Sequence, residues 1–123
     1  MPKKTILKNE VDFEISFFTR LVKSRPRYVH ALIPLAEAYT KKGFYEKGLQ
    51  IDKRLSKLCK DDPLVHYNLA CSYALTGQNE DAFSALFTAI KLGYSDFKHL
   101  GHDPDLKSLK TDPRFKKLLA LTN

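Results

Sequence analysis

The sequence predicts an all-α fold, a short α-solenoid of antiparallel helix pairs, and two observations lead to this expectation. Two stretches repeat each other at a spacing of 34 residues. A period of this size is typical of an array in which each unit is one helix pair that cannot bury its apolar face alone. No stretch alternates between apolar and polar residues as a strand would. The matched positions are Leu35 and Leu69, Ala36 and Ala70, Tyr39 and Tyr73, Gly43 and Gly77, and Gly48 and Ala82.

Proline and glycine set the expected helix ends in the N-terminal half. A first helix over 11–24 stops before Pro26. A second, over 28–42, ends at Gly43, because a left-handed helix terminus favours glycine. A third helix is expected over 45–60. The small residues in the repeat indicate that the paired helices approach each other closely.

The fourth and fifth helices complete a second pair. Pro63 opens a helix over 63–76 that ends at Gly77. Asn79 is the expected N-cap of a helix that reaches Leu92, with acidic residues in its favourable first turn.

Shorter helical segments are expected after Gly93. Ser95 is the expected cap of one turn over 97–100. Two Asp-Pro pairs, beginning at Asp103 and Asp112, each have the form of an N-cap followed by proline at the first helical position. They predict short helices over 104–110 and 113–121.

The repeated residues resemble the tetratricopeptide repeat (TPR) family, and the second unit is the closer match. The first unit departs from the pattern at Leu55, where a small residue is usual, and at Lys60, where proline is usual. The resemblance implies a right-handed solenoid and one TPR-like domain over residues 1–123. Its expected parts are a half unit at about 11–26, full units at about 28–62 and 63–96, and a helical cap at about 97–121.

A second resemblance concerns the tail. The run Asp103-Pro104-Asp105-Leu106, followed by Leu109 and by Asp112-Pro113-Arg114-Phe115, is similar to a closing segment of some bacterial TPR proteins. We expect its apolar residues to cover the open face of the last helix pair, as the ends of solenoids require.

The resemblance implies a non-enzymatic protein–protein interaction module with a concave groove for a peptide or protein. In TPR proteins the first helix of each pair lines this groove. A carboxylate clamp for a chaperone tail is not expected, since Ile33 and Glu37 stand where that clamp has lysine and asparagine. The expected partner-binding residues are His30, Ile33, Glu37, Thr40, Leu64, Tyr67, Asn68, Cys71 and Ala74.

A self-associating structural module is one alternative function. The 11–24 helix carries two apolar strips. One consists of Val11, Ile15, Phe18 and Val22, and the second of Phe13, Phe17 and Leu21. One neighbouring helix covers only one strip. The strip of Phe13, Phe17 and Leu21 is expected to be covered by the preceding segment, through Ile6 and Leu7, or by a second copy of the chain in a homodimer.

A basic adaptor associated with nucleic acid is the other alternative. The net charge is +7, and residues 1–60 hold 14 Lys and Arg against 6 Asp and Glu, a balance of +8. Lys53, Lys57 and Lys60 fall on one expected helix face, with Arg54 beside them. A solvated outer face is the simpler explanation, because no RNA-binding motif accompanies the stripe. A nucleic-acid partner is therefore not expected.

Catalysis, cofactors and metals are also not expected. The chain has no Gly-rich phosphate loop, HExxH or CxxC. His99, His102, Asp103 and Asp105 are close in sequence, but Gly101 and Pro104 interrupt any helix that would hold them on one face. Cys59 and Cys71 form no spaced framework and indicate reduced thiols in a cytoplasmic protein. No segment is apolar enough to span a membrane.

Overall fold

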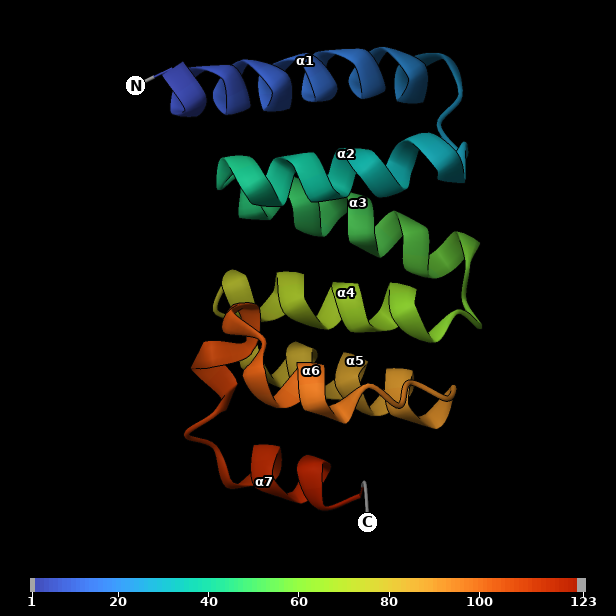
Figure 1. Cartoon of the computed structure of the whole chain (residues 1–123). Coiled ribbons are helices and arrows are strands. Elements are labelled where there is room, and N and C mark those ends of the chain that lie inside the picture. The colour runs from blue at the N-terminus through green and yellow to red at the C-terminus, as the bar shows by residue number, and fades with distance from the viewer. Residues whose placement is uncertain (1, 122–123) are drawn as a thin grey trace. The chain divides into compact units, whose positions relative to one another are not determined.

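A computed structural model describes the backbone of residues 2–121 and the side chains of residues 10–121 (Figure 1). The described chain is all-α, with consecutive helices packed in pairs and no strand, which confirms the expected fold class. None of the described helices combines the length and apolar character needed to cross a membrane. The elements are α1 (Pro2–Ser24), α2 (Val29–Lys42), α3 (Tyr45–Leu58), α4 (Pro63–Leu75), α5 (Asn79–Lys91), α6 (Phe97–His102), the 3-10 helix η1 (Pro104–Leu109) and α7 (Pro113–Ala120).

The chain divides into two compact units, a first unit over residues 1–58 and a second unit over residues 59–123. In the first unit α2 packs against both α1 and α3. One expected apolar strip of α1 faces inward, and Val22 on it is buried. Lys42 at the end of α2 pairs with Asp12 of α1 at 2.6 Å. The first helix was expected over 11–24 but is longer, since α1 begins at Pro2.

Small residues bring α2 and α3 close together, as the repeat predicts. A Cβ added to Gly48 would lie 3.2 Å from Oγ1 of Thr40 and 3.6 Å from the carbonyl oxygen of Ala36. Gly43 ends α2 in the left-handed conformation, with φ of 85°. The third helix ends at Leu58 and not at Lys60, near the positions where the first unit departs from the TPR pattern.

The second unit is built on the pair α4 and α5. Ala70 and Ala82 are both fully buried in it. Asp62 caps α4 by accepting hydrogen bonds from the backbone N–H groups of Leu64 and Val65. The expected cap of α5 is wrong by one residue: Gln78 occupies the N-cap position and makes no side-chain cap bond. The side chain of Asn79 instead accepts a hydrogen bond from Ser108 Oγ at 3.1 Å.

In the C-terminal segment (residues 94–121), two helices begin at the two Asp-Pro pairs. Asp103 and Asp112 cap η1 and α7 respectively, each with proline next in the chain, as expected. Asp96, and not Ser95, caps α6 by accepting from the backbone N–H of His99. The segment buries Leu106, Leu109 and Phe115. Part of it lies against α4, because η1 and α4 are in contact.

Candidate functional site

The four expected partner-binding residues of the first unit lie on one face of α2. Their spacing of three or four residues places them above one another along the helix. His30, Ile33 and Glu37 are exposed. Thr40 is half-buried, and its Oγ1 donates to the carbonyl oxygen of Ala36 at 3.1 Å. In this unit α2 therefore presents an outward row that combines an imidazole, an isoleucine and a carboxylate.

The five expected residues of the second unit divide into two groups. Leu64 and Asn68 on α4 are exposed. Tyr67, Cys71 and Ala74 are buried, with Tyr67 only 3% exposed. Their position along α4 is as expected, but the surface that they share is not open.

The chain's own C-terminal segment covers these three residues. The ring of Tyr67 stacks on that of Tyr94, with centroids 4.3 Å apart and planes 4° from parallel. Ser108 Oγ, whose proton is shared with Asn79, lies 3.4 Å from the carbonyl oxygen of Ala74. In this conformation the C-terminal segment occupies the surface formed by Tyr67, Cys71 and Ala74, so these residues do not line an open groove.

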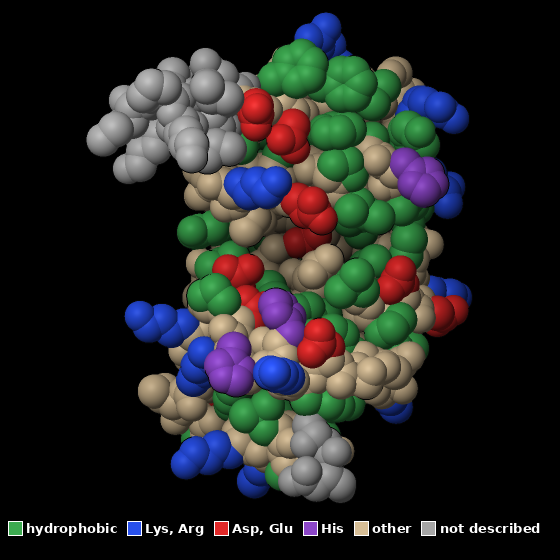
Figure 2. Space-filling view, in the orientation of Figure 1, with side chains coloured by type: hydrophobic (Ala, Val, Ile, Leu, Met, Phe, Trp, Pro, Cys, Tyr) green, Lys and Arg blue, Asp and Glu red, His purple; other side chains and the backbone are tan. Residues whose placement is uncertain are grey.

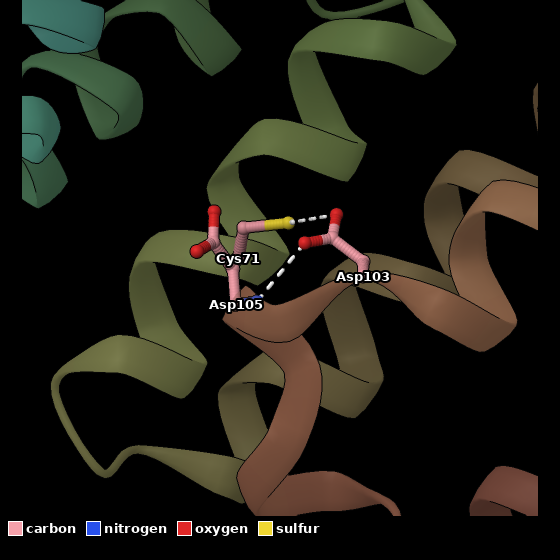
Figure 3. Close-up of side chains that lie close together, drawn as sticks. All are labelled: Cys71, Asp103 and Asp105. Carbon is pink, nitrogen blue, oxygen red and sulfur yellow. Dashed lines mark hydrogen bonds between the residues drawn. The ribbon is translucent and has the colours of Figure 1, made fainter.

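The carboxylate of Asp103 is the centre of this contact (Figure 3). Its Oδ2 accepts from the Tyr67 hydroxyl at 2.6 Å and from Cys71 Sγ at 3.7 Å. Nε2 of His99 lies 3.2 Å from the same oxygen. Oδ1 accepts from the backbone N–H of Asp105 at 3.0 Å. Asp103 is only 6% exposed, so it joins α4, α6 and η1 through a buried polar group.

Burial controls the protonation of the groups around Asp103. It raises the pKa of the Tyr67 hydroxyl and that of the Cys71 thiol far above their ordinary values, and the neighbouring carboxylates add to the effect on Cys71. Both groups therefore keep their protons at neutral pH and act as hydrogen-bond donors. Burial, followed by the charge of Asp103, also raises the pKa of Asp105.

The histidine and aspartate group considered in the sequence is only partly assembled. His102 contacts the carbonyl oxygen of Lys98 through Nδ1 at 2.9 Å and not the carboxylates. Cys71 lies beside the two aspartates instead, and the ligand atoms of Cys71, Asp103 and Asp105 all lie within 4.8 Å of one another. Sequence spacing could not indicate Cys71, because it precedes Asp103 by 32 residues.

The second apolar strip of α1 is open to solvent. Phe13 is 66% and Phe17 44% exposed, and their rings stack with centroids 6.0 Å apart. Leu21 is half-buried. Figure 2 shows hydrophobic side chains on the surface along α1, at the top of the view. The expected cover through the side chains of Ile6 and Leu7 lies outside the described residues.

The expected basic stripe is shorter than the sequence indicated. Lys60 lies beyond the end of α3 and belongs to the second unit. Arg54 and Lys57 are exposed on α3. Nη1 of Arg54 donates to the carbonyl oxygen of Pro26 at 3.4 Å, which places the guanidinium beside the α1–α2 turn.

Both cysteines are free thiols.

Comparison with known proteins finds no family model that matches the chain. The chain is similar to a chloroplastic protein of Arabidopsis thaliana, with 38% identity over 84 residues. The match covers 66% of this chain but spans only 25% of that protein. The relative's name places it in the chloroplast, so the comparison does not support the cytoplasmic location expected from the cysteines, which stays a prediction.

Proposed function

We propose that this protein is a non-enzymatic, TPR-like interaction module that binds a peptide or protein through the outward face of α2. The observation that carries the proposal is the exposure of His30, Ile33 and Glu37 on that helix. The TPR resemblance assigns ligand contacts to these positions. Arrays of helix pairs are suited to such a role because they present an extended surface.

The chemistry of this α2 face indicates what it would bind. Ile33 offers an apolar contact, and Glu37 one turn further along offers a carboxylate. An apolar side chain followed by a lysine or arginine would bury surface against Ile33 and pair with Glu37. On α4, Leu64 and Asn68 stay exposed beside the covered residues and offer a smaller surface.

A peptide selection tests the proposal. Immobilised intact chain would be presented with a random peptide library, and the selected peptides measured by isothermal titration. We expect sequences that join an apolar residue to a basic one. Ile33→Ala with Glu37→Lys should weaken their binding at least tenfold while circular dichroism stays unchanged.

The matched control places substitutions on the exposed face of α3. Arg54→Glu with Lys57→Glu should leave the selected peptides bound. The opposite result, in which only the α3 pair matters, would contradict the proposal. If RNA or DNA then bound in a steeply salt-dependent way, the nucleic-acid adaptor would be the better explanation.

Self-association is a second candidate function, supported by the open strip on α1. Two stacked, exposed phenylalanines form an apolar surface of the kind that marks interfaces. A twofold contact would place the strip of one copy on the same strip of the other.

Light scattering of the wild type and of Phe13→Glu/Phe17→Glu tests the homodimer. The wild type should be dimeric and the double variant monomeric. Phe87→Glu, at an exposed phenylalanine of α5, is the control and should stay dimeric. A wild type that remains monomeric at high concentration would exclude the homodimer.

A further inference from the structure

We propose that the second unit binds one zinc ion where its C-terminal segment crosses α4. The donor side chains come from α4, α6, η1 and the residue between α6 and η1, and they are Cys71, His99, Asp103 and Asp105. Imidazole, carboxylates and the deprotonated thiol are ligands that zinc takes in proteins, and zinc would displace to solvent the proton that Cys71 holds in the metal-free chain. This inference does not depend on the binding role proposed for α2.

The separations around Asp103 agree with tetrahedral zinc. Sγ of Cys71 and Nε2 of His99 lie 3.7 Å and 3.2 Å from Oδ2 of Asp103. In a tetrahedral site with Zn–S of about 2.3 Å and Zn–N and Zn–O of about 2.0–2.1 Å, sulfur–oxygen and nitrogen–oxygen separations are about 3.5 Å and 3.3 Å. The thiol and the imidazole thus each already lie at ligand spacing from the Asp103 carboxylate.

Asp105 would supply the fourth ligand. Its carboxylate oxygen lies within 4.8 Å of the ligand atoms of Cys71 and Asp103, and Figure 3 shows the three side chains gathered at this crossing. Rotation of the Asp105 side chain, which is half-buried, would bring the oxygen closer. The His99 side chain is 56% exposed, so an ion could enter from solvent on that side.

The groups behind these donors hold Asp103 in place. The Tyr67 hydroxyl donates to Oδ2, and the backbone N–H of Asp105 donates to Oδ1. Ligating carboxylates are commonly oriented by such outer hydrogen bonds. A bound ion would join α4 to α6 and η1, and would keep the surface of Tyr67, Cys71 and Ala74 covered.

Cobalt titration of the full chain tests the site, with zinc competition to measure affinity. The protein would be stripped of metal with chelator, freed of the chelator and kept reduced with a phosphine. We expect one ion per chain and a thiolate-to-cobalt charge-transfer band that zinc abolishes. Cys71→Ser should lose the band, whereas Cys59→Ser, at the other free thiol, should keep it.

The histidines provide a second pair of matched variants. His99→Asn should weaken zinc binding at least tenfold, while His102→Asn, whose ring contacts the Lys98 carbonyl, should not. His99 is exposed, so its replacement tests the site even where Cys71→Ser fails to fold. Zinc should also slow amide hydrogen exchange in α6 and η1.

Three results would overturn the proposal. The first is wild-type chain that binds neither metal in the titration. The second is a charge-transfer band that follows Cys59 and not Cys71. The third is equal zinc affinity for the wild type and His99→Asn.

Discussion

Replacing Asp103 with alanine tests whether one buried carboxylate holds the C-terminal segment onto α4. The substitution removes the acceptor of the Tyr67 hydroxyl, which is bonded at 2.6 Å within a side chain that is 3% exposed. It also removes the cap of η1, because Oδ1 accepts from the backbone N–H of Asp105. The hydroxyl would then be buried without this partner.

The two losses set the expected magnitude. A buried hydrogen bond to a carboxylate is worth about 1.5–3 kcal/mol, and removal of an N-cap costs about 1 kcal/mol. Because the two share one side chain, we expect Asp103→Ala to destabilise the second unit by about 2–4 kcal/mol in total. In a domain of roughly 60–100 residues each kcal/mol lowers Tm by about 4–8 °C.

Urea unfolding followed by circular dichroism, in chelator so that no metal contributes, measures this cost. Asp96→Ala is the matched control, since Asp96 is an exposed cap that accepts from the backbone N–H of His99. It should cost about 0.5–1 kcal/mol. A double-mutant cycle with Tyr67→Phe should give a coupling energy of about 1–2 kcal/mol.

The outcome that refutes this reasoning is specific. If Asp103→Ala costs no more than Asp96→Ala, and its effect adds to that of Tyr67→Phe without coupling, the buried carboxylate does not hold the tail.

Three further predictions concern the second unit. Ala70→Leu should destabilise by about 1–3 kcal/mol in thermal melts, because the helix pair has no room for three more carbons. Gly77→Ala should cost about 1–2 kcal/mol in urea unfolding, because φ is 77° and a side chain disfavours this left-handed backbone conformation. Since nothing lies within 4 Å of the new Cβ, neighbouring atoms add no clash to this cost. Hydrogen bonds from Arg114 lower the pKa of Asp112 to about 2. Their contribution to the stability of the folded state is therefore present above the carboxyl's pKa in the unfolded chain, about 4, and is lost as pH falls from about 4 to about 2. The Tm difference between wild type and Arg114→Gln should therefore shrink over that pH range.

Controls make each of these outcomes decisive. Lys57→Leu on the exposed face of α3 should be close to neutral, so an effect equal to that of Ala70→Leu would contradict the repeat register. Gly101→Ala should cost less than Gly77→Ala, because Gly101 is helical and the new Cβ would meet only Leu119, at 3.6 Å. A Tm difference for Arg114→Gln that grows on acidification would contradict the sign derived for Asp112.

The sequence by itself determined the all-α class, the helix pairs and most of the helix ends. Left-handed glycines at 43 and 77 and the two Asp-Pro caps lie where they were expected. These features depend on interactions within about one helical turn, so a local pattern contains the necessary information. The 34-residue period likewise indicated that small residues such as Ala70 would be buried.

Only the tertiary structure decided which surfaces stay open. Tyr67 occupies the expected position on α4, yet its partner is Asp103, 36 residues later in the chain. The side chain of Asn79 likewise has a distant partner, because it accepts a hydrogen bond from Ser108 Oγ, 29 residues later in the chain. Periodicity predicts the face of a helix on which a residue lies, but not the distant segment that packs against that face. A contact between segments so far apart depends on loop closure and burial in the whole unit, which no short stretch of sequence encodes.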